Sequence, residues 1–233
     1  DGSFMQLSPA RTIYPGNYII NYEGLKNIIP FGYLRLRMSG PTAGRLVQAE
    51  IGGRFATVNL PMLHTRTLPG DEKNFRPGVE ATAKNIDLSD EFERQFFGDL
   101  MLFSVAELVT KTDLRNNPDQ QLIEQTLHRI EQEMLVRYQE KHAQVLKRVT
   151  GLEEMLSDKN QWWHAKQETT NALQQLDQFC RNVRHNFGED SRAYRLIQSP
   201  SHRDQRREQI LQALIQYPQA RDAWDSLFIK SFQ

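Results

Sequence analysis

The clearest pattern of apolar and polar positions runs from Asn117 to Asn160 and predicts one long amphipathic helix. Counted at about 100° per residue from Ile123, the apolar side chains fall within roughly one quadrant of the helix, as in a helix with one buried stripe. Asn117 suits the N-cap, Pro118 the first helical position and Asp119 the positive end of the helix dipole. The stripe also contains Leu127, Ile130, Met134, Tyr138, Val145, Val149, Leu152 and Leu156.

A second apolar repeat, from Gln161 to Phe187, predicts a partner helix. Its members recur in alternating steps of four and three, which is the seven-residue repeat of a coiled coil. Gly188 follows where a C-terminal cap belongs. Because the connection between the two stripes is short, we expect a long antiparallel helical hairpin. The repeat consists of Trp162, Lys166, Thr169, Leu173, Leu176, Cys180, Val183 and Phe187.

Further helices are predicted on both sides of this pair. Ser89 caps a helix that is expected to reach about Leu114, and its nearly continuous apolar surface places it at the centre of the fold. Three shorter helices are expected after the pair, separated by Ser199-Pro200 and by Pro218. Their predicted ranges are 191–198, 201–217 and 219–232.

Residues 1–70 predict a small antiparallel sheet. Gly52-Gly53 separates two apolar runs and can supply the positive φ angles of a tight hairpin. Ser39 to Arg45 superficially resembles a phosphate loop but lacks its Lys-Ser/Thr ending, so we interpret it as a connection between strands. The expected strands are Phe31 to Met38, Leu46 to Ile51, Arg54 to Leu60 and, more weakly marked, Asn17 to Tyr22.

The predicted fold class is therefore α+β, with a small N-terminal antiparallel sheet followed by a mostly helical body built on the hairpin. We expect a β-rich subdomain over 1–70, a connecting loop over 71–88 and a helical domain over 89–233. The polar stretch with Pro69-Gly70 and Pro77-Gly78 marks the boundary. The alternative is one continuous domain in which the helices pack directly on the sheet.

Composition narrows the functional classes. The 233 residues include 29 basic and 29 acidic side chains, so net charge gives no argument for nucleic-acid or membrane binding. The single cysteine excludes an internal disulfide or a multi-cysteine zinc site. The most apolar run, Leu100 to Val109, is too short to span a bilayer. Because the chain starts at Asp1 and shows no signal-like segment, we expect a piece of a longer protein. The single cysteine and the lack of a signal-like segment favour a cytoplasmic location.

One flank of the long helix carries carboxylates and imidazoles that suggest a metal or proton-transfer site. Carboxylate and imidazole side chains bind divalent metals, but the spacing of these residues matches neither a zincin nor a di-iron pattern. Glu–His pairs four residues apart also stabilise ordinary helix surfaces. Lys141 and His142 interrupt the apolar stripe, either as a polar register pin or as a Lys beside a hydrated gap. The candidates are Glu124, His128, Glu131 and His142.

Binding candidates lie in the C-terminal third of the chain. An arginine-rich segment suits phosphates and carboxylates because each guanidinium donates two parallel hydrogen bonds, although a solvated basic face is the commoner meaning of such a segment. Trp162 and Trp163 cannot share one helix face. One alternative is that one of them is exposed at the hairpin tip as a binding hot spot, and the other is that it packs on a following element. Cys180 occupies a core position of the repeat and fits a small buried side chain better than a nucleophile. The arginines are Arg181, Arg184, Arg192, Arg195, Arg203, Arg206 and Arg207.

No catalytic or cofactor motif of defined spacing occurs, and no cofactor is implied. The favoured hypothesis is a non-enzymatic protein-interaction or scaffolding module, because a helix of about 50 Å exceeds what a compact domain of this size needs. One alternative is an enzyme with a dispersed active site on the flank of the long helix. The other is nucleic-acid or phosphate binding through the arginine-rich segment.

Overall fold

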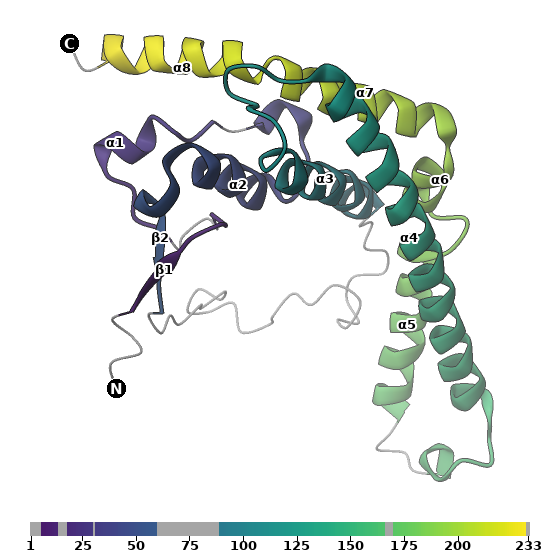
Figure 1. Cartoon of the computed structure of the whole chain (residues 1–233). Coiled ribbons are helices and arrows are strands. Elements are labelled where there is room, and N and C mark those ends of the chain that lie inside the picture. The colour runs from purple at the N-terminus through teal and green to yellow at the C-terminus, as the bar shows by residue number, and fades with distance from the viewer. Residues whose placement is uncertain (1–5, 14–17, 30, 60–88, 166–169, 232–233) are drawn as a thin grey trace. The chain divides into compact units, whose positions relative to one another are not determined.

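The computed structural model describes residues 6–13, 18–29, 31–59, 89–165 and 170–231 (Figure 1). The protein is mostly helical with one small antiparallel sheet, in broad agreement with the predicted class. None of the described helices is both long and apolar enough to cross a membrane. The elements are β1 (Leu7–Pro9), α1 (Tyr22–Leu25), η2 (Gly32–Leu34), α2 (Ser39–Ile51), η3 (Gly52–Arg54), β2 (Ala56–Val58), α3 (Ser89–Leu108), α4 (Gln120–Ser157), η4 (Trp162–Ala165), α5 (Thr170–Phe187), α6 (Arg192–Gln198), α7 (Pro200–Ile215) and α8 (Tyr217–Ser231).

Two compact units divide the chain. The first unit contains the described residues within 1–62, 94–134 and 200–233, and the second contains those within 63–93 and 135–199. Helices α3 and α4 each contribute residues to both units, since the divisions fall within them. The predicted division into a β-rich subdomain and a helical domain stays a prediction, and the connecting loop 71–88 lies outside the described residues.

The long helix is the best-predicted element. It runs from Gln120 to Ser157, and the predicted stripe is buried or half-buried along its length. The predicted cap is wrong, because the Asp119 side chain accepts the Leu122 N–H at 3.0 Å and thereby caps the helix. Asn117 lies before the helix, in a bridge with Asp113.

The predicted strand Arg54 to Leu60 contains β2, but the other strands predicted for the N-terminal region are wrong. The stretch predicted as Leu46 to Ile51, together with the supposed connection Ser39 to Arg45, forms helix α2, and Gly52 ends this helix at a φ of 55°. Phe31 to Met38 contains the short 3-10 helix η2 in place of a strand. Tyr22 begins helix α1, and Asn17 lies outside the described residues.

Only three residues on each side form the sheet in the described part of the chain. β1 and β2 pair antiparallel, with Leu7 opposite Val58, Ser8 opposite Thr57 and Pro9 opposite Ala56. All six residues are exposed, so the sheet contributes little to the core. The hydrophobic core of the first unit is instead helical.

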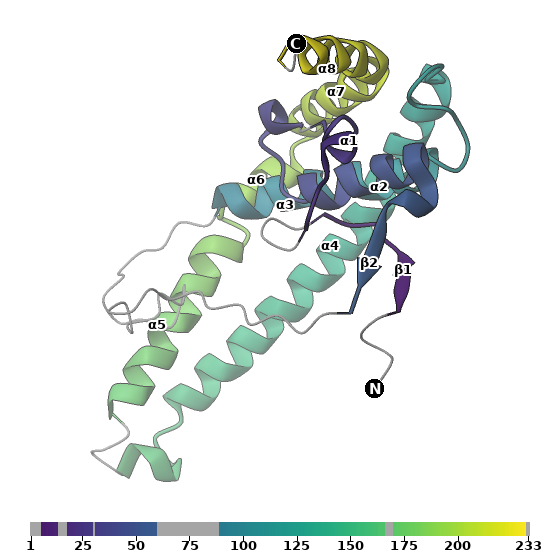
Figure 2. The same ribbon diagram turned by 90° about the vertical axis from the view of Figure 1, so that its left-hand side faces the viewer.

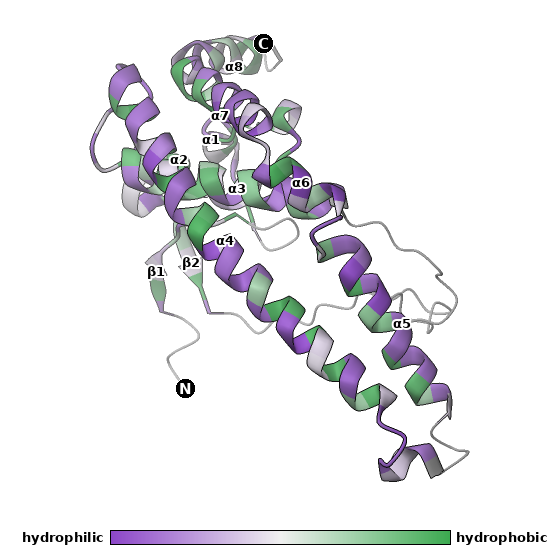
Figure 3. Cartoon of the chain, turned by 90° about the vertical axis from the view of Figure 1, so that its right-hand side faces the viewer, coloured by the Kyte–Doolittle hydropathy of each residue, from purple (hydrophilic) through white to green (hydrophobic). Residues whose placement is uncertain are grey.

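Helix α3 supplies much of that core. Figure 3 colours it largely hydrophobic, and Phe97, Leu100 and Val105 are fully buried. Phe103 is 48% exposed, so the surface of the helix is less completely covered than its sequence predicts. Gly98 allows close packing, because a Cβ there would lie 2.2 Å from the Arg37 carbonyl oxygen. The helix ends at Leu108, one and a half turns before the predicted Leu114.

In the second unit, α5 lies beside the C-terminal half of α4 (Figure 2). Arg184 of α5 donates from Nε to Glu153 Oε1 at 2.7 Å and from Nη2 to Thr150 Oγ1 at 2.8 Å. The predicted helix from Gln161 is too long, because η4 occupies Trp162–Ala165 and α5 begins at Thr170. Lys166 and Thr169 of the predicted repeat lie outside the described residues.

The C-terminal helices follow their predicted ranges closely. Ser191 caps α6 by accepting the Tyr194 N–H at 3.2 Å, and Gly188 N–H closes α5 on the Arg184 carbonyl at 2.8 Å. Pro218 lies in the first turn of α8, where its missing N–H costs nothing. It therefore stands inside the helix that it was expected to precede.

Candidate functional site

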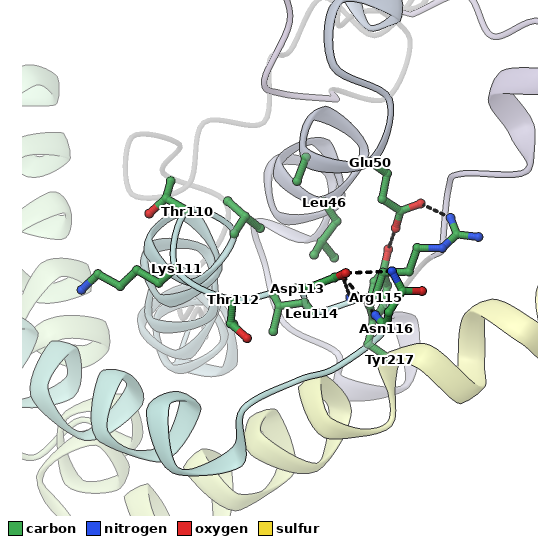
Figure 4. Close-up of a pocket in the computed structure, with 12 residues that line it drawn as sticks. Leu46, Glu50, Thr110, Lys111, Thr112, Asp113, Leu114, Arg115, Asn116 and Tyr217 are labelled. Atoms are coloured by element: carbon green, nitrogen blue, oxygen red, sulfur yellow. Dashed lines mark hydrogen bonds and ion pairs between the residues drawn. The ribbon is translucent and has the colours of Figure 1, made fainter.

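A pocket of about 700 Å³ lies in the first unit (Figure 4). This volume is within the range of small-molecule sites in proteins. Helix α2 contributes Leu46, Ala49 and Glu50, the segment Val109–Asn116 between α3 and α4 forms a second side, and Tyr217 closes it from the start of α8. Three stretches distant in sequence therefore build the pocket.

Glu50 is the centre of the polar network beside the pocket. Its carboxylate is 3.2 Å from Arg221 Nη2 and 2.8 Å from Arg115 Nη1, and it accepts a hydrogen bond from the Tyr217 hydroxyl. Arg221 is only 2% exposed and also donates to the Lys26 carbonyl. Two donors from α8 and one from the α3–α4 connection thus converge on one carboxylate of α2 and tie these three segments together.

Tyr217 acts in this network as a donor. Burial raises the pKa of its phenol above the usual value, and the negative charge of Glu50 raises this pKa further. The phenol therefore remains protonated at neutral pH and cannot serve there as a base. Its role is to hold Glu50 in place.

The other charged groups that line the pocket are also engaged. Asp113 accepts from the Asn116 side chain at 2.8 Å and from the Arg115 and Asn116 N–H groups at 3.1 Å each. These hydrogen bonds, that from the Asn116 side chain foremost, lower the pKa of Asp113. Lys111 Nζ lies 2.6 Å from Glu107 Oε1. The pocket consequently offers a ligand few charges that the fold does not already use.

A second buried ionic cluster surrounds Glu131 of α4, also in the first unit. Glu131 is 1% exposed, and its two oxygens lie 3.2 Å from Arg203 Nε and 2.8 Å from Arg207 Nη1 of α7. Arg207 also reaches Asp204 at 2.5 Å. This arrangement brings a predicted metal ligand together with two predicted binding arginines. Their charges neutralise one another, which indicates a role in holding α7 against α4.

The remaining metal candidates are engaged differently. Glu124 is exposed and accepts from Gln120 Nε2 at 2.9 Å, and His128 is exposed on the same helix. His142 belongs to the second unit and is buried. Among the residues that the structure describes, no group of three or more His, Cys, Asp or Glu side chains could hold a metal ion.

His142 lies in an aromatic cluster. Its ring stacks on Tyr194 at 4.3 Å and approaches Phe187 at 5.3 Å and Tyr138 at 6.0 Å. It is 4% exposed, and within the described part of the chain its Nε2 has no hydrogen-bond partner. Burial lowers the pKa of His142, opposed by a backbone hydrogen bond at Phe187 and by the charge of Glu189. His142 is therefore a packed core residue, whereas Lys141 is exposed.

Most of the predicted binding arginines are held by partners within their own unit. Arg206 donates to the Leu34 carbonyl at 3.2 Å and lies over the Phe97 ring at 5.6 Å. Arg181 pairs with Asp177, Arg184 with Glu153 and Arg192 with Asp90. Arg195 is exposed and makes no ion pair with any residue that the structure describes. The seven arginines do not present one shared set of unengaged charges.

The two tryptophans differ in exposure, as their adjacency predicts. Trp162 is 64% exposed, whereas the indole nitrogen of Trp163 is buried. Their rings meet edge to face at 5.7 Å. Cys180 is 1% exposed, and burial raises its thiol pKa, as expected of a core residue and not of a nucleophile.

Sequence reasoning missed the Glu50 network entirely. Its partners are 65 and 167 residues away in the chain, and no local spacing marks Glu50, Arg115 or Tyr217 as a group. Comparison with known proteins adds no assignment, since no family model, curated protein or solved structure matches the chain.

Proposed function

We propose that this protein is a non-enzymatic interaction module in which α4 and α5 form an extended antiparallel hairpin that contacts another protein through its tip. The observation that carries this proposal is the 64% exposure of Trp162. Tryptophan is enriched among the residues that contribute most to protein–protein binding, because it buries a large area and loses little side-chain entropy.

The turn that presents Trp162 is fixed to the end of α4. A ring nitrogen of His164 lies 2.9 Å from the Leu156 carbonyl, and Gln161 Nε2 donates to Asp158 Oδ2 at 2.7 Å. Such contacts fix the turn that carries the indole before a partner arrives. Preorganisation of this kind reduces the entropy that binding must overcome.

Contacts inside the second unit support the hairpin. Glu153, near the C-terminal end of α4, pairs with Arg184 of α5. His142, which precedes Glu153 in α4, contacts Phe187, which follows Arg184 in α5. Contacts in this order are those of helices that run in opposite directions. The pairing gives the tip a scaffold within the second unit.

Two alternatives have less support. A dispersed active site would need unpaired acids or bases in a pocket, but the charged groups lining the 700 Å³ pocket are engaged with one another or with neighbouring residues. Nucleic-acid binding through the arginine-rich segment would need free guanidinium groups, and Arg203 and Arg207 are committed to Glu131.

Site-specific photo-crosslinking in the native host tests the proposal. A photoreactive residue replaces Lys159, which is exposed in the turn after α4, or, as the control, Gln121, which is exposed at the start of α4 in the first unit. A discrete protein adduct is expected from position 159 and not from position 121. The additional change Trp162→Ala should remove this adduct, and the purified partner should alter the fluorescence of Trp162.

Two results would overturn the proposal. One is the absence of any adduct from position 159 under conditions where a surface control crosslinks to a known neighbour. The other is an adduct that persists at full yield in the Trp162→Ala variant.

A further inference from the structure

The exposed side of α4 carries a run of basic residues that the fold does not use. Arg137, Lys141, Lys147 and Arg148 are all exposed, and none forms an ion pair or hydrogen bond with any residue in the described part of the chain. Between positions 137 and 148 the only acidic side chain is Glu140, so four cations and one carboxylate leave a local net charge of +3. We call these four residues the basic face.

The basic face is directional. At about 100° per residue, Arg137, Lys141 and Arg148 lie within about 40° of one another, whereas Lys147 lies about 80° or more from each of them around the helix. Arg137 to Arg148 spans about 16 Å along the helix axis. Arg137, Lys141 and Arg148 thus form a row about three turns long.

This row is unfavourable for the isolated helix. Like charges four residues apart, such as Arg137 and Lys141, destabilise a helix, whereas a surface chosen only for solubility usually alternates signs. An anionic partner would relieve the repulsion. The charge pattern therefore indicates a surface that is completed by binding.

Apolar side chains lie on and beside the row. Met155 is 52% exposed, and Val136, which is 55% exposed, lies about 100° from Arg137 around the helix, on the side of Lys147. Met155 lies eighteen residues after Arg137 and so returns to the same side of the helix. Exposed aliphatic and thioether groups beside a charged row are typical of surfaces that bind an amphipathic helix.

We propose that the basic face, with Val136 and Met155, docks an acidic amphipathic helix of a partner protein. The inference rests on the proposed interaction function and identifies the chemistry of the partner. Glu140 within the row favours a protein, because a partner helix can place a Lys opposite it while a phosphate backbone would be repelled. The exposed apolar groups at positions 136 and 155 also suit a helix better than a polyphosphate.

Fluorescence anisotropy with the purified full chain tests this inference. The probe is a labelled designed peptide helix with Leu along one stripe and Glu on both flanks, and a peptide with Lys in place of each Glu is the negative control. We expect binding of the acidic peptide that weakens as salt is added. The double change Lys141→Glu and Arg148→Glu should weaken it by about tenfold or more.

A matched control has the same change in net charge elsewhere. Arg54 and Lys230 in the first unit are exposed and have no ion pair within the described residues, so Arg54→Glu with Lys230→Glu should leave peptide binding within about twofold of the parent. Equal loss in the two double variants would show a general charge effect and would overturn the inference.

Two further probes separate the partner classes. Polyuridylate and phosphatidylserine-containing vesicles present phosphates without an amphipathic helix. If either bound through Lys141 and Arg148 while the acidic peptide did not, the protein-helix assignment would be wrong. If the acidic peptide does not bind but the Trp162-dependent crosslink forms, only this inference is rejected. If the acidic peptide binds but the crosslink does not form, only the proposed role of the tip is rejected.

Discussion

The two halves of α4 use their charges in opposite ways. Up to Met134, in the first unit, Glu131 is buried between two arginines, and Arg129 joins Glu107 and Glu133. From Arg137 to Arg148, in the second unit, the arginine and lysine side chains are exposed and form no ion pair or hydrogen bond with any described residue. One continuous helix therefore carries charges that stabilise the fold and charges that remain available for binding.

The difference lies in burial and not in sequence composition. A buried carboxylate must be paired, because taking an ion out of water costs several kcal/mol. An exposed cation loses almost nothing if its partner is removed, since surface ion pairs contribute about 0–1 kcal/mol. The comparison thus predicts very unequal responses to charge substitutions along one helix.

The largest effect is expected at Glu131. Glu131→Gln removes the charge that neutralises Arg203 and Arg207, so we expect the first unit to lose about 3–5 kcal/mol of stability. Denaturant-dependent hydrogen exchange at the amides of α7 measures this loss. Glu133 lies two residues after Glu131 and forms a half-exposed ion pair with Arg129. Glu133→Gln breaks this pair and should cost less than about 1 kcal/mol of stability. Similar losses in both variants would show that burial does not distinguish the pairs.

A smaller, pH-dependent effect is expected at His142 in the second half of α4. The folded protein favours the neutral ring, because burial holds the pKa of His142 below its unfolded value of about 6.5. The unfolded chain then binds the proton more readily. The stabilisation is complete above about pH 6.5 and is lost as the pH falls through the lower folded pKa.

The groups that face His142 sharpen this test. Tyr194 and Phe187 cover the ring, Glu189 opposes the shift, and burial raises the pKa of Tyr138 to about 12, so that phenol does not titrate in this range. His142→Phe should remove much of the stability loss seen between neutral and mildly acidic pH in denaturation followed at α5. An unchanged pH dependence in this variant would exclude His142 as its source, and His128→Gln on the exposed surface serves as the control.

Local periodicity explains which elements the sequence predicts correctly. The stripe of α4 and the caps of the C-terminal helices depend on residues within one or two turns, so α4, α6, α7 and α8 match their predicted ranges closely. The error at α2 has a local cause as well. Gly52 adopts a positive φ of 55°, which serves a hairpin and a helix end equally, and the sequence around it does not distinguish the two.

The candidate sites depend on pairings that no local pattern contains. Glu131 meets arginines 72 and 76 residues away, and Glu50 meets a tyrosine 167 residues away. The helical spacing makes Glu131 a metal candidate, because the spacing shows which residues share one face of the helix. The spacing does not show which residues cover that face. Only the packing of α7 reveals that its charge is neutralised.

The smallest effect is expected on the basic face. Lys141→Glu removes the repulsion from Arg137 and places an opposite charge four residues after it, so stability should change by no more than about 0.5 kcal/mol, in the favourable direction if at all. Hydrogen exchange across α4 measures this change, under the same conditions as for Glu131→Gln. A loss near 2 kcal/mol would mean that Lys141 already has a partner within the folded chain, and the contrast between the two halves of α4 would fail. A change near zero, combined with weaker binding of the acidic peptide, would separate the binding charges of the helix from its structural ones.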